Sequence, residues 1–193
     1  MSFFDVFKKR HQFARDIFYD YLFDEYTEAQ LRAIPHESMN TLVWNMWHVA
    51  RVEDSGVTRF VTGEEQVLKS GNWNAKMNID VMSFGYGMSR DDMTRLSETI
   101  NLEGLRGYWN AVIDFTFTAL DSLTEDRLEE VITVAERDRI LIDEEVGYEH
   151  VKEDNPYAGM TRRDALYHFS VLHYYWHGGE VRTIQAWLRS QEA

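Results

Sequence analysis

The sequence has no cysteine and only two prolines among its 193 residues. Without cysteine the chain forms no disulfide, offers no thiolate to zinc and has no thiol nucleophile of its own. Pro35 and Pro156 leave long stretches between them and beyond them in which a helix meets no proline. Any metal site in this chain must therefore be built from His, Asp or Glu.

Basic residues are also scarce, because 20 Lys and Arg face 33 Asp and Glu for a formal net charge of −13. Such a chain repels phosphate backbones and the anionic inner leaflet of a membrane. The sequence lacks Gly-rich phosphate loops, Gly-x-Ser-x-Gly elbows and apolar runs long enough to cross a bilayer. Its first ten residues place their charges after the phenylalanines, the reverse of a secretory signal. We therefore expect a cytoplasmic protein that binds neither nucleic acid nor membranes.

The apolar residues, 44% of the chain, predict one helical domain over residues 1–193. They recur mostly at spacings of three and four, which is the period of an amphipathic helix rather than of a strand. Gly63 serves as a helix stop, and Thr161 with Asp164 has the pattern of a helix N-cap. We expect an all-α fold with four long helices, at about residues 3–23, 40–63, 105–123 and 161–189.

Two segments between these helices have a weaker pattern. Residues 64–101 are rich in Gly, Asn and Ser and predict a long crossover, with a short helix at residues 90–100. Residues 124–157 are acidic and contain a β-branched run at 131–134. This second segment is compatible with a hairpin or with a broken helix, and the sequence does not choose between them.

Three histidines interrupt the apolar stripes of the predicted helices. His173 and His177 are four residues apart, so both rings can reach one ion at about 2.0 to 2.1 Å. His48 lies in the middle of another predicted helix, between Trp44 and Val52. A neutral ring on a core-facing stripe costs free energy unless its nitrogens have partners. The three rings are therefore either the ligands of one divalent metal ion with an open coordination position, or core histidines bonded to side chains or buried water.

Two stretches of sequence resemble the DinB-like superfamily: residues 40–54, NTLVWNMWHVARVED, and residues 173–181, HYYWHGGEV. The resemblance implies a four-helix bundle of up-down-down-up order with a long second crossover. It also implies that His48, His173 and His177 hold one divalent ion, with zinc as first candidate and nickel, iron or manganese as alternatives.

Members of the resembled family with an assigned reaction are transferases or isomerases that use low-molecular-weight thiols such as bacillithiol or mycothiol, and many are homodimers. The resemblance implies a metal-dependent transferase or hydrolase in which a thiol or a metal-bound water attacks a small electrophile. The alternative is a non-catalytic stress-response binding module whose histidines are structural. A third interpretation, the three-histidine iron site of sulfoxide synthases, ranks last because those enzymes need an additional large domain.

Glu180 lies one turn beyond His177 and is the candidate catalytic residue near the ion. It could orient an imidazole N–H or transfer a proton. It could equally be an edge residue that pairs with Arg51 or Arg182. The sequence leaves both roles open.

Other polar residues near the predicted site have less specific patterns. His11 lies on the apolar stripe of the first helix and is either a fourth ligand, a substrate contact or a satisfied core histidine. Glu53 and Asp54 are rotated off the His48 face, which predicts a solvated helix end. No role is assigned to His36, His150 and His168.

Aromatic residues are abundant around the predicted site. The consecutive side chains 174–176 must point in different directions around a helix, so at least one should face another surface, which a second subunit would cover. The candidates for the core or for the wall of a substrate cavity are Trp44, Trp47, Trp109, Tyr174, Tyr175 and Trp176.

Overall fold

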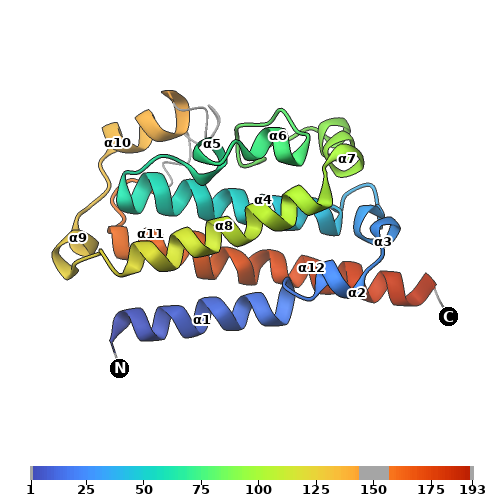
Figure 1. Cartoon of the computed structure of the whole chain (residues 1–193), viewed down its shortest axis with the longest axis horizontal. Coiled ribbons are helices and arrows are strands. Elements are labelled where there is room, and N and C mark those ends of the chain that lie inside the picture. The colour runs from blue at the N-terminus through green and yellow to red at the C-terminus, as the bar shows by residue number, and fades with distance from the viewer. Residues whose placement is uncertain (1, 144–156, 192–193) are drawn as a thin grey trace.

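The computed structural model describes residues 2–143 and 157–191, and this part of the chain is mostly helical (Figure 1). No strand forms within these ranges; Val131 and Thr161 make an isolated antiparallel bridge. The predicted all-α fold is confirmed. No helix of the described residues combines the length and the apolar character needed to cross a bilayer. His150 and the rest of 144–156 lie outside the described residues.

Four long helical segments make up the body of the molecule. α12 packs against α1 and against α4, and α4 also packs against α8. In Figure 1 the colours show that α1 and α12 run from left to right, whereas α4 and α8 run from right to left. Their bounds are Phe3–Phe18 for α1, Leu42–Ser55 for α4, Leu102–Leu120 for α8 and His173–Gln191 for α12. A π-helical turn, η1 (Gly56–Thr62), extends α4, and α11 (Arg162–Tyr167) with π-helical η4 (His168–Leu172) precedes α12.

Short helices fill the connections. The crossover from η1 to α8 spans the upper part of Figure 1 and contains the short helix predicted at residues 90–100. Residues 124–143 form short helical pieces and no hairpin. The short elements are α2 (Leu22–Glu25), α3 (Glu28–Arg32), α5 (Val67–Ser70), α6 (Trp73–Met77), α7 (Arg90–Thr99), α9 (Glu125–Glu129), α10 (Val134–Asp138) and η2 (Arg139–Asp143).

The ends of the long helices follow local chemistry. Thr41 caps α4 by accepting a hydrogen bond from the backbone N–H of Trp44 at 3.0 Å. Thr161 and Asp164 form the predicted capping box of α11. Gly63 ends η1 with φ at +86°, a conformation that glycine adopts without strain.

The first helix is shorter than predicted, because α1 ends at Phe18 rather than near residue 23. Tyr19 leaves the helix with φ at −130° and is fully buried. Its ring lies 5.4 Å from that of Trp109 and 5.3 Å from that of Tyr174, and its hydroxyl donates to the Tyr174 carbonyl. A contact with distant helices therefore overrides the local helical pattern.

α4 is buried on every side, and this overturns the prediction that Glu53 and Asp54 are solvated. The Asp54 carboxylate accepts hydrogen bonds from Tyr108 at 2.6 Å and Arg51 at 3.0 Å, and from the backbone N–H groups of Val67 and Leu68 at 2.8 and 2.9 Å. Burial raises the pKa of Asp54, and its partners offset this only in part. The crossover therefore buries the end of α4, which the sequence pattern predicted to be exposed to water.

Glu53 is the centre of a second buried network. Its carboxylate accepts from His11 at 2.9 Å, Thr116 at 2.6 Å and Tyr174 at 2.6 Å. Burial acts to raise the pKa of Glu53, but His11 and these hydrogen bonds outweigh it, so the pKa is lowered. His11 is therefore a core histidine that joins α1 to α4, one of the three roles that the sequence left open.

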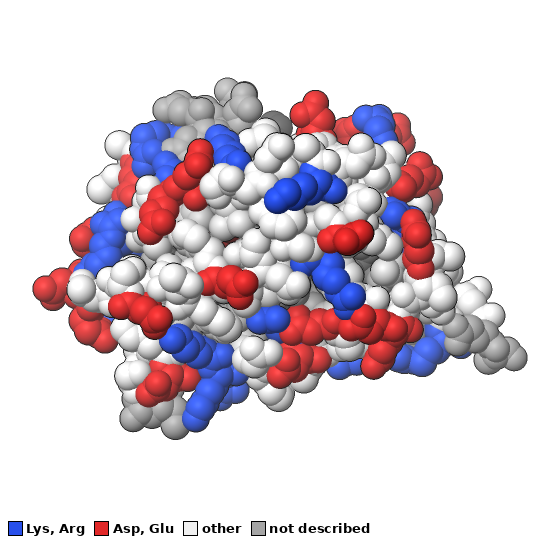
Figure 2. Space-filling model, in the orientation of Figure 1, with Lys and Arg blue, Asp and Glu red and all other residues white. Residues whose placement is uncertain are grey.

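The surface carries both signs of charge. Figure 2 shows acidic and basic side chains intermixed on one face of the molecule, with no basic side chains gathered into a single patch. This face therefore offers no continuous basic stripe of the kind that tracks a phosphate backbone.

The close approach of α12 to α1 predicts opposite effects for two adjacent glycines. A Cβ atom on Gly178 would lie 2.6 to 2.8 Å from ring carbons of Phe18, whereas one on Gly179 would have nothing within 4 Å. We expect Gly178→Ala to lower the free energy of unfolding by about 1 to 3 kcal/mol. Gly179→Ala should raise it by about 0.5 to 1 kcal/mol, because alanine favours a helix over glycine. Urea denaturation of both variants tests the pair, and equal shifts would contradict the packing described here.

Candidate metal centre

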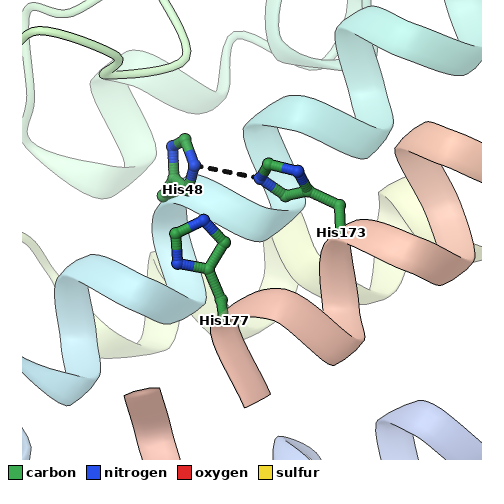
Figure 3. A group of neighbouring side chains, drawn as sticks. All are labelled: His48, His173 and His177. Carbon is green, nitrogen blue, oxygen red and sulfur yellow. Dashed lines mark hydrogen bonds between the residues drawn. The ribbon is translucent and has the colours of Figure 1, made fainter. Parts of the chain in front are cut away.

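Three imidazoles converge between α4 and α12 (Figure 3). His48 lies in the middle of α4, and His173 and His177 lie one turn apart at the start of α12. The nitrogens that could bind an ion all lie within 4.8 Å of one another, and the Nε2 atoms of His48 and His173 are 3.0 Å apart. The convergence predicted from sequence is confirmed.

Hydrogen bonds fix the orientation of two of the rings. The Nδ1–H of His48 donates to the backbone carbonyl of Phe84 in the crossover. The Nδ1–H of His177 donates to Asn45 Oδ1 at 3.0 Å and to Glu180 Oε2 at 3.2 Å. With the proton held on Nδ1, each Nε2 keeps a free lone pair. This is the arrangement that metal-bound histidines adopt.

His173 differs from the other two, because its buried Nδ1 has no hydrogen-bond partner. Its Nε2 faces His48 Nε2, so the pair either shares a proton or directs two lone pairs at a common point. The donor set thus fits a divalent ion.

Burial keeps the rings of His48 and His173 neutral. His48 is 3% exposed, and burial, followed by the nearby His177, lowers its pKa from 6.5 to about 3. Burial also lowers the pKa of His173 well below its usual value, with further contributions from His48 and His177. A neutral imidazole is the form that binds a metal ion.

Glu180 lies beside His177, and the structure does not pair it with either arginine considered from the sequence. Arg51 bonds to Asp54, and Arg182 donates to the backbone carbonyl of Ile17. Burial acts to raise the pKa of Glu180, but hydrogen bonds from His177 and from the Asn40 backbone N–H prevail, and the pKa is lowered. An ionised carboxylate therefore accepts the His177 Nδ1–H.

Sequence reasoning missed two of the groups that hold the imidazoles. Asn45 precedes His48 by three residues, so helical spacing alone could have placed it on the same side of α4. No sequence signal identifies the Phe84 carbonyl, because a backbone group in a loop carries none.

A cavity of about 400 Å³ adjoins the three imidazoles. Trp44 and Trp176 line it, and the Trp44 ring stacks on His48 at 4.5 Å with an angle of 13° between their planes. The other aromatic residues considered for its wall belong to the core: Trp47, Trp109 and Tyr174 are buried, and the partly buried Tyr175 packs against the same core cluster. A larger hollow of about 630 Å³ lies between residues 78–88 and α7 and contains no histidine.

Comparisons with known proteins agree with this fold. The family model described as the DinB superfamily matches residues 14–181. The crystal structure of a conserved protein from Enterococcus faecalis is similar over 98% of this chain and 99% of its own, with a TM-score of 0.74 and 18% sequence identity. No curated protein matches the chain significantly.

The low pKa of His48 predicts a pH dependence for the metal-free protein. Between about pH 6.5 and pH 3 the unfolded chain binds the proton that folded His48 rejects, so stability falls as the pH falls through this window. We expect His48→Gln to flatten the pH dependence of the free energy of unfolding by up to about 1.4 kcal/mol per pH unit. Urea denaturation in EDTA between pH 7 and pH 5 measures this, and parallel slopes for the two proteins would contradict it.

Proposed function

The chain belongs to the DinB superfamily, and from this membership and its converging imidazoles we propose that it binds one divalent metal ion through Nε2 of His48, His173 and His177. Zinc is the first candidate, because three imidazoles around an open position form a frequent zinc site, and nickel, iron and manganese also accept such ligands. The single observation that carries the proposal is that the ligand nitrogens of all three rings lie within 4.8 Å of one another.

We further propose that the protein is a metal-dependent transferase or hydrolase acting on a small electrophile. A divalent ion, when bound, lowers the pKa of a thiol or water and polarises a substrate oxygen. The chain has no cysteine, so in the transferase version the sulfur comes from a low-molecular-weight thiol. A cavity of about 400 Å³ supports a small-molecule substrate.

The residues around the ion have separate roles in this proposal. Glu180 holds the His177 ring through its Nδ1–H and can take a proton during the reaction. The Phe84 carbonyl holds His48 in the same way. Trp44, stacked on His48, excludes water from one side of that ring. These groups preorganise the ligands before an ion arrives.

One observation favours the alternative of a binding module with structural histidines. The 3.0 Å separation between His48 Nε2 and His173 Nε2 also suits a hydrogen bond between two neutral rings. In that case the cluster would hold α4 against α12 without a metal ion. A homodimer stays a prediction; the largely exposed Trp176 is the aromatic side chain that a partner would cover.

Metal analysis separates the two functions. We expect untagged protein to contain about one divalent ion per chain, and His48→Ala, His173→Ala and His177→Ala each to retain less than about a tenth of it, because three ligands are the minimum for such a site. His36→Ala is the matched control, since His36 is exposed and its ring bonds to the neighbouring Ser38, two residues away. If the wild-type protein contains no metal, or if the three variants keep their metal, the proposed metal site is wrong and the histidines are structural.

The role of Glu180 predicts a smaller effect on affinity. Glu180→Gln should weaken metal binding by about tenfold, the lower end of the range for a lost partner of a ligand, because Asn45 still accepts the His177 proton. Competition with a chromophoric chelator measures the dissociation constant, and Glu103→Gln is the exposed control. An unchanged constant would show that Glu180 does not orient the ring.

A further inference from the structure

The walls of the cavity beside the imidazoles carry no formal charge in the described part of the chain. No Lys, Arg, Asp or Glu is among its lining residues. Apart from four histidines, Asn40 and Ser55, the lining is apolar or aromatic, and the aromatic rings include Trp44, Phe60, Phe84, Tyr157 and Phe169. Such a surface favours flat apolar molecules.

The charged groups that act on the site from the adjacent helices offer nothing to an anion. Arg51 is fully buried, and its guanidinium donates to Asp54 at 3.0 Å, Gln66 at 2.7 Å and the Met82 carbonyl at 2.6 Å. Glu180, on the other helix, adds a negative charge beside His177. Among the described residues, an anionic group in the cavity would therefore meet no available cation.

A bound divalent ion places its positive charge at one end of the cavity, and its attraction for an anion weakens with distance. Its charge attracts the atom that binds it, such as a sulfur that loses its proton. A second anionic group several ångströms away would lie against aromatic rings and lose its water without gaining a partner. The site should therefore bind a molecule with a negative charge far from the metal-bound atom more weakly than an uncharged molecule of the same shape.

The entrance of the cavity is also aromatic. Tyr86 and Trp176 both line it and are 60% and 59% exposed, so they lie where the cavity opens to water. Trp176 packs edge-on against His168 and His173, whose ring centres lie 5.2 and 5.9 Å away. A molecule that enters would pass these two aromatic side chains, neither of which carries a charge.

We propose that this cavity binds an uncharged, flat and largely apolar molecule, held at one atom by the metal ion, and that it rejects the same molecule when a carboxylate is placed far from that atom. The inference rests on the proposed metal site and narrows its substrate class. It makes an uncharged thiol or electrophile the partner of the reaction rather than one that carries carboxylates.

Two probes that differ by one carboxylate test this proposal. Benzyl mercaptan is uncharged before it binds, and 4-(mercaptomethyl)benzoic acid adds a carboxylate across the ring from the sulfur. Both are titrated anaerobically into Co²⁺-loaded protein, with the near-ultraviolet sulfur-to-cobalt band and calorimetric heat as readouts. We expect benzyl mercaptan to bind at least about tenfold more tightly.

A charge introduced at the entrance provides the matched variants. Tyr86→Arg supplies a cation at an exposed position and should strengthen binding of the carboxylated probe by about tenfold. Tyr86→Gln removes the same ring without adding charge and should give no such gain. If the two variants treat the carboxylated probe alike, charge does not govern selection in this cavity and the proposal is wrong.

The outcomes separate this inference from the metal site. Equal or tighter binding of the carboxylated probe overturns it, and so does failure of both probes when the visible cobalt bands show that the ion is bound. If cobalt does not bind, the proposed metal function fails. Calorimetry of the metal-free protein then decides the part of the inference that concerns charge: a retained preference for benzyl mercaptan supports rejection of the carboxylate by the cavity, and no preference overturns it.

Discussion

α4 is buried along its whole length, so its polar side chains lie in the core rather than in water. An ionised or polar side chain inside a protein is tolerated only when it is hydrogen-bonded, neutral or paired. Asp54 is held by Arg51 and Tyr108, and Glu53 by His11, Thr116 and Tyr174. Among the described residues, His48 on the same helix bonds to the Phe84 carbonyl and to His173 and to no carboxylate. Burial therefore leaves it neutral, which is the form that can offer a lone pair to a metal ion.

The same contacts hold α12 in place beside α4. The Tyr174 hydroxyl donates to Glu53, and the Tyr174 carbonyl accepts from Tyr19 at the end of α1. One turn later, Gly178 lets α12 approach the Phe18 ring. Tyr174 lies between His173 and His177 in sequence but points into the core. The hydrogen bonds of Tyr174 therefore hold the same turn of α12 that carries the two imidazoles.

The site therefore combines two environments. Around the imidazoles, oriented acceptors such as the Phe84 carbonyl and Glu180 prepare the ring nitrogens. Beyond them, the cavity is aromatic and without formal charge in the described residues. A metal ion placed between them would bring a strong positive charge to a cavity whose described lining has none. This division supports a site that selects its reacting atom by coordination and the rest of the molecule by apolar contact.

The sequence by itself determined the features that depend on neighbours in the chain: the helical period, the cap at Thr161, the stop at Gly63, and the pairing of His173 with His177 on one helix face. The position of His48 on a core-facing stripe was also readable. The tertiary structure alone decided that α1 ends at Phe18, that Glu53 and Asp54 are buried, and that a loop carbonyl holds His48. Those features depend on which distant segments cover a helix, and the free energy of such packing outweighs the local preferences that a sequence pattern records.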